Sequence, residues 1–155
     1  GEENKGFIYL MQELPRERLG LGSQAVGACE GAMAITADYV KQRKAFGSTI
    51  AQFQNTRFKM AELRAQLELT KAYLKQCEAR FKVGAMTTEE ASILKLMSTE
   101  LQVKLTHECL QLFGGYGYTE EYPISRFFTD ARVQTIYAGT SEIMKEVIAR
   151  GELGR

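Results

Sequence analysis

The sequence predicts an all-α fold, an antiparallel (up-and-down) four-helix bundle with short additional helices. Three observations predict it. Apolar residues recur at spacings of three and four along most of the chain. Only two prolines interrupt the 155 residues, and no segment alternates apolar with polar residues as a half-buried strand would. A chain of this length forms a single domain that buries about two-thirds of its unfolded surface.

The first long helix is predicted to follow Pro15. A short helical pattern occupies positions 7–14, and Pro15 then suits the first turn of a helix that runs to about Phe46 and ends at Gly47. Its first half is rich in glycine and alanine, although each glycine lowers helix stability by roughly 1 kcal/mol. Either a bulky ligand or a closely packed helix therefore lies against this stretch.

The remaining helices follow from local stop and start signals. Residues 48–52 form a connection, and a second helix then runs to about Val83 before Gly84 stops it. Thr87 with Glu90 three residues later is a capping-box pattern that starts the third helix. This helix reaches Gly114, where a glycine- and aromatic-rich loop (114–122) begins.

Two shorter helices complete the chain. Pro123 opens a fourth helical stretch to about Val133, and Thr140 can cap a last short helix to Arg150.

Composition excludes several function classes. The net charge is +1, and no basic block offers a phosphate-binding surface, so we expect no nucleic-acid partner. No apolar run reaches the length of a membrane span. Three widely spaced cysteines indicate reduced thiols in an intracellular compartment. A single histidine leaves a zinc site almost without ligands, so we expect no metal.

Four segments are unusual for a simple bundle. Residues 14–19 place Glu17 between two arginines near a helix start, where a surface cap is the ordinary alternative. Residues 42–47 put an arginine beside an aromatic ring and a glycine. Residues 111–118 combine a glutamine with glycines that permit close approach of a ligand. Residues 136–143 expose backbone amides at a helix start, which can hold an anion or a polarised carbonyl.

Together these segments resemble the acyl-CoA dehydrogenases. The order Arg-x-x-Phe-Gly, Gln-x-Phe-Gly-Gly-x-Gly and Tyr-x-Gly-Thr-Ser, at these separations, is typical of that family and covers essentially the whole chain. The resemblance implies a helical domain that follows an amino-terminal helical domain and a middle β-domain. Residues 1–13 would then be the tail end of the middle-domain region, and residues 14–155 the C-terminal bundle.

The resemblance also implies FAD as cofactor, shared across the interface of a homotetramer or homodimer. It assigns FAD contacts, partly to a neighbouring subunit, to Arg43, Phe46, Gln54, Gln111, Leu112, Phe113, Gly114, Gly115, Thr140, Ser141 and Glu142. Ala45 stands where some members have an FAD-binding threonine. The substrate would be an acyl-CoA thioester, and an electron-transfer flavoprotein would accept the electrons.

The catalytic base is implied to lie on the first long helix. Many members carry a glutamate where this chain has Ala138, which cannot accept a proton. Long-chain and isovaleryl-CoA dehydrogenases instead place the carboxylate directly before a family arginine, which here is Glu17 before Arg18. The surrounding residues are more similar to the long-chain type. Substrate contacts are expected at Pro15, Arg16, Arg18, Ala138 and Gly139.

Two alternatives remain at this point. An acyl-CoA oxidase would use oxygen with the same residues, and a non-catalytic helical assembly module would need neither Glu17 nor the glycine-rich loop. The expected location is intracellular, in a bacterial cytoplasm or a mitochondrial matrix. We also expect that these 155 residues alone bind FAD weakly and do not catalyse.

Overall fold

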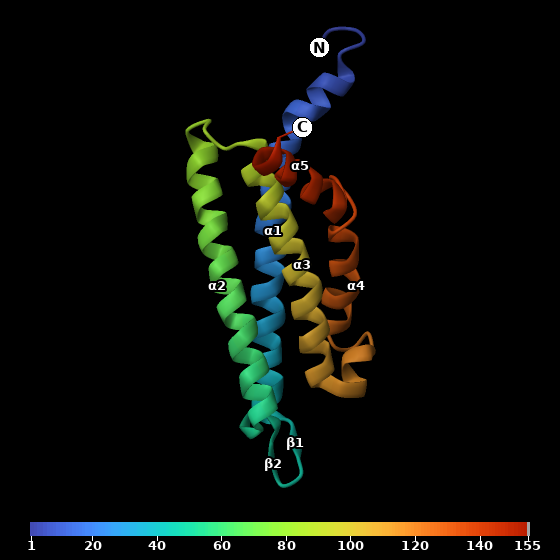
Figure 1. Cartoon of the computed structure of the whole chain (residues 1–155). Helices are drawn as coiled ribbons and strands as arrows, with labels where there is room; N and C mark the ends of the chain where they lie inside the picture. Colours follow the sequence, from blue (N-terminus) through green and yellow to red (C-terminus); the bar gives the residue numbers. More distant parts are fainter. Residues whose placement is uncertain (155) are drawn as a thin grey trace.

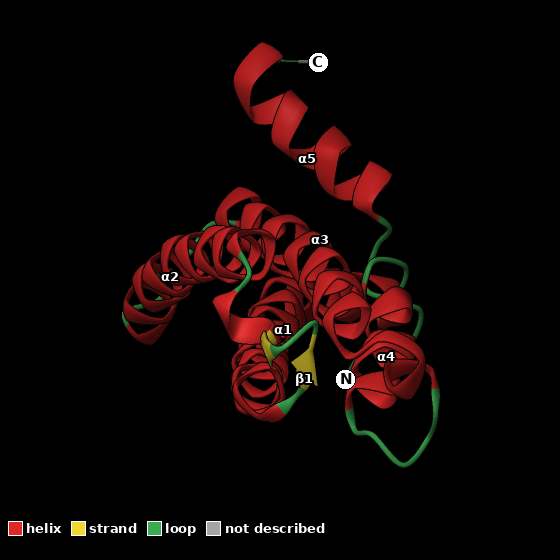
Figure 2. Cartoon of the chain, turned by 90° about the horizontal axis from the view of Figure 1, so that it is seen from below, coloured by secondary structure: helices red, strands yellow, loops and turns green. Residues whose placement is uncertain are grey.

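The computed structural model describes residues 1–154, and four of its helices run up and down one long axis (Figure 1). These helices are α1 (Gly6–Gln42), α2 (Gln54–Lys82), α3 (Thr88–Phe113) and α4 (Ile124–Gln134). The short helix α5 (Ser141–Leu153) points away from the bundle at one end (Figure 2). The predicted up-and-down four-helix bundle with an additional short helix is confirmed.

Helices α1 and α3 form the central pair, with α2 packed on one side of it and α4 on the other (Figure 1). The two helices approach closely because Gly22 has no side chain: a Cβ there would lie 2.6 Å from Cγ of Leu94. At Gly31 a Cβ would lie 3.1 Å from the ring of Phe127, whereas Gly27 faces open space. Helix packing therefore accounts for part of the glycine-rich stretch. The continuous core comprises Val26, Cys29, Ala32, Met33, Leu63, Leu67, Leu74, Cys77, Leu94, Leu101, Leu105, Cys109, Phe113 and Ile124.

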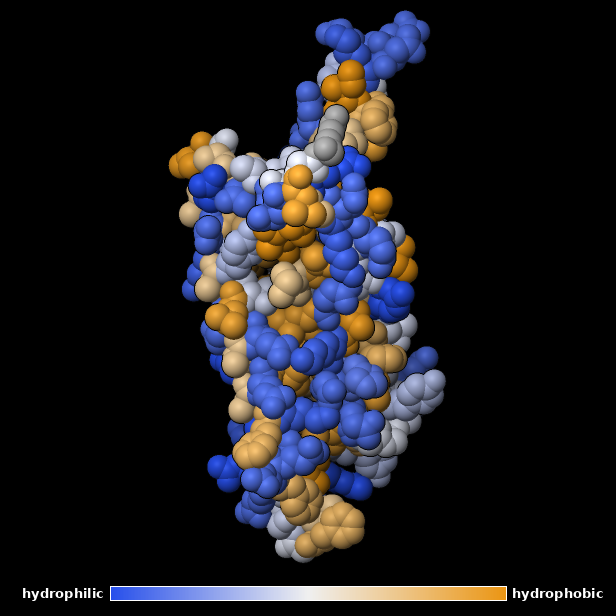
Figure 3. Space-filling view, viewed as in Figure 1, coloured by the Kyte–Doolittle hydropathy of each residue, from blue (hydrophilic) through white to orange (hydrophobic). Residues whose placement is uncertain are grey.

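Helix α1 begins earlier than predicted. It starts at Gly6 and continues through Pro15 without a break, so the prediction of a separate short helix before Pro15 was wrong. Proline lacks the N–H that would bond the carbonyl of Met11. Met11 is exposed, so water can replace the missing donor. The projecting start of α1 also carries exposed apolar side chains (Figure 3), among them Phe7, Ile8 and Leu10.

Helix α1 also ends earlier than predicted, at Gln42 rather than near Phe46. A small antiparallel hairpin follows, formed by β1 (Lys44–Ala45) and β2 (Ser48–Thr49). Phe46 and Gly47 connect the strands with φ of 51° and 85°, the positive values that a tight two-residue hairpin requires. The sequence gives no sign of this hairpin, because two-residue strands are too short to show an alternating pattern. A single 3₁₀ turn (Ile50–Gln52) leads into α2.

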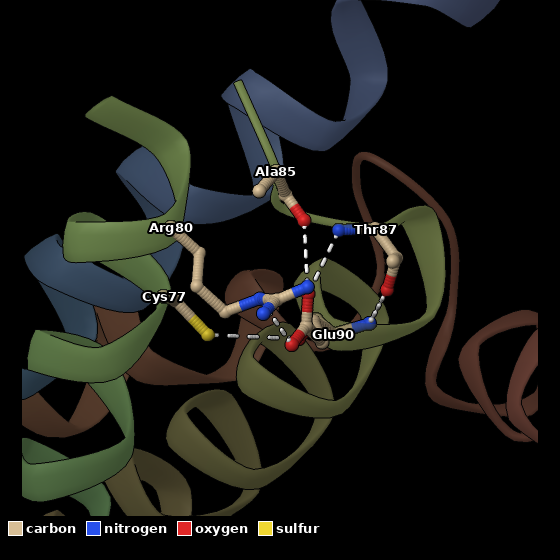
Figure 4. A network of polar contacts seen from close by, with 5 residues as sticks. All are labelled: Cys77, Arg80, Ala85, Thr87 and Glu90. Atoms are coloured by element: carbon tan, nitrogen blue, oxygen red, sulfur yellow. Dashed lines mark hydrogen bonds and ion pairs between the residues drawn. The ribbon is translucent and has the colours of Figure 1, made fainter. Parts of the chain in front are cut away.

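The connection between α2 and α3 contains the predicted capping box (Figure 4). The backbone N–H of Glu90 donates to the hydroxyl of Thr87 over 3.1 Å, and the N–H of Thr87 donates to the Glu90 carboxylate over 2.8 Å. Arg80, from the last turn of α2, pairs with the same carboxylate at 2.7 Å and donates to the carbonyl of Ala85. One carboxylate thus caps α3 and holds the end of α2.

The second half of the chain follows its local signals. A 3₁₀ turn (Gly114–Tyr118) occupies the glycine-rich loop, and the N–H of Ile143 donates to the Thr140 hydroxyl at the start of α5, as predicted. No helix within residues 1–154 is long and apolar enough to cross a membrane. In the same range, no group of three or more His, Cys, Asp or Glu residues is arranged to hold a metal ion.

Candidate functional site

A pocket of about 450 Å³ forms where the end of α1 meets the glycine-rich loop. We call it the glycine-loop pocket. Six of the predicted cofactor residues line it: Arg43 and the continuous run 111–115. Gly114 ends α3 with a positive φ of 62°, and a Cβ on Gly115 would meet no atom within 4 Å. The backbone of the loop is therefore open to a ligand.

Aromatic rings fix the walls of this pocket. Tyr39 stacks on Phe113 with ring centroids 4.1 Å apart, and its hydroxyl donates to the Phe113 carbonyl. Tyr116 stacks on Tyr122 at 5.3 Å, and the Arg43 guanidinium lies 5.3 Å from the centre of the Tyr116 ring. A guanidinium, a carboxamide (Gln111) and unhindered backbone suit a diphosphate-containing ligand, because they combine positive charge with hydrogen-bond donors. The donor set therefore fits the diphosphate side of a dinucleotide.

A second pocket, of about 280 Å³, lies at the start of α5. We call it the Ser141 pocket; it is lined by Glu100, Val103, Arg132, Thr135, Ile136, Thr140, Ser141 and Glu142. The Ser141 hydroxyl donates to Glu100 on α3. The Glu142 carboxyl is hydrogen-bonded by the backbone N–H of Glu142 and by the Thr140 hydroxyl, and both contacts lower its pKa. Nine of the eleven predicted cofactor residues thus fall into two separate pockets.

The third site is the tight turn formed by Ala138 and Gly139, the 138–139 turn. Both residues have positive φ, 53° and 103°. Arg18, buried on α1, donates from Nε to the Ala138 carbonyl at 3.4 Å and from Nη1 to the Ser92 hydroxyl at 3.0 Å. Burial lowers the pKa of the Arg18 guanidinium, and the neighbouring Glu17 carboxylate opposes this. The turn is thereby tied to the helix that carries Glu17.

A side chain at position 139 would be strained. Its φ of 103° is unfavourable for an L residue, and a Cβ would lie 2.6 Å from Cε of the buried Met144, which would have to shift. Within residues 1–154, the N–H groups of Ala138, Gly139 and Thr140 donate to no protein acceptor. The turn consequently presents free donors, which can hold the oxygen of a carbonyl.

The other predicted substrate residues are placed differently. Glu17 is exposed and adjacent in sequence to Arg18. Arg16 is exposed and pairs with Glu13 at 3.6 Å, and with Pro15 it lines a separate pocket of about 320 Å³ near the end of α2. The structure thus brings Arg18, Ala138 and Gly139 together, and places Pro15 and Arg16 elsewhere on α1.

Two predicted cofactor residues lie outside both pockets. The Phe46 side chain is 98% exposed at the tip of the hairpin, with its ring 6.4 Å from that of Phe53, and Gln54 is exposed at the start of α2. Neither touches the glycine-loop pocket. Their exposure leaves them free to contact a group bound to another chain.

Sequence reasoning missed Lys95. This lysine of α3 has a relative exposure of 0%, and its Nζ donates to the Gly139 carbonyl at 2.7 Å. The sequence shows only that polar residues recur on α3 at spacings of three and four, and the structure shows that these residues are buried: Ser92, Lys95, Thr99, Gln102 and Thr106. Tyr39, Ile50 and Tyr116 in the glycine-loop pocket, and Glu100 and Arg132 in the Ser141 pocket, were also missed.

The fold and these sites define a class: a helical bundle that presents a dinucleotide-type pocket at one end and a donor-rich turn at the other. Residues 4–153 match the model of the protein family described as "Acyl-CoA dehydrogenase, C-terminal domain". The chain belongs to the acyl-CoA dehydrogenase family, as this C-terminal domain.

Individual relatives agree with this assignment. The chain is 51% identical over 150 residues to the mitochondrial long-chain specific acyl-CoA dehydrogenase of Mus musculus, covering 97% of this chain and 35% of that protein. An acyl-CoA dehydrogenase from Geobacillus kaustophilus superposes with a TM-score of 0.95 at 41% identity, over 99% of this chain and 40% of the other. The chain therefore spans about a third to two-fifths of the length of these relatives.

Two further relatives bear on cofactor and partner. The caffeyl-CoA reductase-Etf complex subunit CarC of Acetobacterium woodii is 38% identical, over 96% of this chain and 39% of that protein. A glutaryl-CoA dehydrogenase from Mycobacterium smegmatis, in complex with FADH2, superposes with a TM-score of 0.89 at 25% identity, over 92% of this chain and 37% of the other.

Proposed function

We propose that this chain is the helical domain of an FAD-dependent acyl-CoA dehydrogenase that desaturates long-chain acyl-CoA thioesters. The observation that carries the proposal is the Arg18 bond to the Ala138 carbonyl. It ties the segment that contains Glu17 to the turn whose free N–H groups suit a thioester carbonyl. The 51% identity to a long-chain specific enzyme supports the chain-length preference.

Glu17 is the proposed base. A proton α to a thioester is too weakly acidic to be removed unless the carbonyl is polarised and a carboxylate is held at the carbon. The Ala138 N–H can polarise the carbonyl because that role needs no side chain, and Gly139 leaves room for the thioester. FAD would supply the acceptor for the β-hydride.

The glycine-loop pocket is the proposed site for the diphosphate side of FAD. Arg43, Gln111 and the 114–115 backbone would hold it, and Thr140, Ser141 and Glu142 would contact the cofactor from the Ser141 pocket. Phe46 and Gln54 would contact FAD of a second copy in a homo-oligomer, which agrees with their exposure. An electron-transfer flavoprotein is the proposed acceptor, and a bacterial cytoplasm or mitochondrial matrix the proposed location.

The test is Glu17→Gln in the complete flavoenzyme, assayed with a long-chain acyl-CoA and an electron-transfer flavoprotein. Loss of a general base lowers turnover by about 10²–10⁴-fold, and we expect a loss in this range with FAD still bound. Glu13→Gln is the matched control, because Glu13 is also exposed, lies one turn earlier on α1 and should be dispensable.

Two outcomes sharpen the test. Adding Ala138→Glu to the Glu17→Gln enzyme should restore part of the activity, with an altered chain-length preference. Full turnover of the single Glu17→Gln variant would refute the assignment of the base. Turnover with oxygen in place of the flavoprotein acceptor would identify an oxidase.

A further inference from the structure

Lys95 is a buried cation that the proposed chemistry does not yet use. Its side chain is completely enclosed, and its hydrogen bond is to the Gly139 carbonyl at 2.7 Å. Within residues 1–154, no carboxylate oxygen lies within 4.0 Å of the Lys95 Nζ, the limit for an ion pair. Desolvation lowers the pKa of the Lys95 ammonium and the positive charge of Arg18 lowers it further, whereas the more distant carboxylates of Glu100 and Glu142 partly oppose this. Such a group is costly to bury, so a hydrophobic residue would serve a purely structural role better.

The Lys95 side chain donates its hydrogen bond to a turn with an unusual backbone conformation. Ala138 is a non-glycine residue with positive φ, and Gly139 follows with a φ of 103°. Two successive carbonyls of this turn each accept a hydrogen bond from a buried cation, Arg18 on α1 and Lys95 on α3. With both carbonyls fixed, the peptide planes on either side of Gly139 cannot rotate freely.

We propose that Lys95 is a positioning residue that acts through the Gly139 carbonyl to hold the 138–139 turn in its left-handed form. The two bonds fix the peptide planes that carry the N–H groups of Gly139 and Thr140. By holding the turn in its left-handed form, they also keep the preceding N–H of Ala138 directed at the thioester carbonyl. The inference rests on the proposed function. It assigns Lys95 to the orientation of the donor, whereas Glu17 removes the proton.

The test compares two lysines of α3 in the complete flavoenzyme. Lys95→Met keeps the length and apolar stem but removes the donor, and Lys104→Met is the control because Lys104 is exposed and bonds Gln66. Misplacing a catalytic group by about 1 Å can cost about 10²-fold in rate. We therefore expect kcat of Lys95→Met to fall roughly 10- to 100-fold, with FAD content and Tm retained, and Lys104→Met to match the wild type.

A second readout separates positioning from stability. The C=O stretch of a bound α,β-enoyl-CoA shifts to lower frequency when the carbonyl is polarised. We expect this shift to be smaller in Lys95→Met than in the wild type or in Lys104→Met, and to be partly recovered in Lys95→Arg, which keeps a cationic donor.

The outcomes are distinguishable. A Lys95→Met enzyme with wild-type kcat and an unchanged carbonyl shift would overturn the positioning role. The positioning role would also be overturned if kcat of Lys95→Met fell only in proportion to a loss of FAD and the FAD-bound fraction showed the wild-type shift of the C=O stretch. A wild-type enzyme that fails to bind and dehydrogenate acyl-CoA would instead overturn the proposed function itself.

Discussion

The contact between Gly22 and Leu94 gives the sharpest test of the bundle. Gly22→Ala would place a Cβ 2.6 Å from Cγ and 2.8 Å from Cδ2 of Leu94, whose side chain is completely buried. Overpacking a core costs about 1–3 kcal/mol, and the better helix propensity of alanine returns about 1 kcal/mol. Because Leu94 has no free space to enter, we take the upper part of the overpacking range, about 2–3 kcal/mol, and expect a net loss of about 1–2 kcal/mol.

Gly27→Ala is the matched control on the same helix. A Cβ at Gly27 meets no atom within 4 Å, so this substitution should stabilise the chain by up to about 1 kcal/mol. For a chain of this size, each kcal/mol shifts Tm by about 2–4 °C. Thermal unfolding of the 155-residue chain should therefore show a fall of about 2–8 °C for Gly22→Ala and a rise of up to about 4 °C for Gly27→Ala.

A double-mutant cycle locates the cause. Leu94→Ala alone should cost about 2–5 kcal/mol, but it removes the atoms that the new Cβ would meet. The double variant should thus lose less stability than the sum of the two single changes, by about 1 kcal/mol or more. Equal stabilisation by Gly22→Ala and Gly27→Ala would refute the close packing of α1 on α3.

Two other predictions concern titratable groups. The Thr87 N–H, assisted by Arg80, lowers the pKa of the Glu90 carboxyl; its stabilising effect is therefore present above the unfolded value near 4.5 and is lost as the pH falls through the folded pKa. In urea unfolding between pH 7 and 3, the free energy of unfolding should fall less with decreasing pH in Glu90→Gln than in the wild type or in Glu62→Gln, a control at an exposed glutamate of α2. Identical profiles would contradict the assignment. Burial raises the pKa of the Cys29 thiol to about 12, so a disulfide reagent at pH 8 should label this cysteine only after unfolding in urea; rapid labelling of the folded chain would contradict its burial.

Local chemistry made much of the fold predictable. The capping box at Thr87, the stop at Gly84 and the cap at Thr140 were all readable from sequence, because each depends on residues within three or four positions. The hairpin was not, since the helical pattern continues to Phe46. The helix ends because Arg43 takes an extended conformation, with ψ of 123°, and Phe46 and Gly47 then turn the hairpin with positive φ. Sequence periodicity does not report the backbone conformation of a single residue.

The candidate site was predictable only in part, for a similar reason. Motifs identified the run 111–115 and Arg43, which the structure gathers in one pocket. Lys95 was missed because a lone lysine among apolar residues is usually assigned to a solvated face. Its burial depends on α1 and on the 138–139 turn, which lies more than 40 residues further along the chain. Long-range contacts of this kind leave little trace in one sequence.

The two cations behind the 138–139 turn offer a physical reason why the proposed catalytic carboxylate could be supplied either from position 17 or from position 138. Arg18 and Lys95 donate hydrogen bonds to the backbone carbonyls of Ala138 and Gly139. The positions of these two cations therefore do not depend on which side chain stands at position 138. A carboxylate from position 138 or from Glu17 would meet the same positive potential, and the Glu17 charge already acts on Arg18. The turn and its cations would then form the fixed part of the site, and the carboxylate the exchangeable part. That is why we expect Ala138→Glu to restore activity to Glu17→Gln in the presence of Lys95, and to fail when Lys95→Met is added.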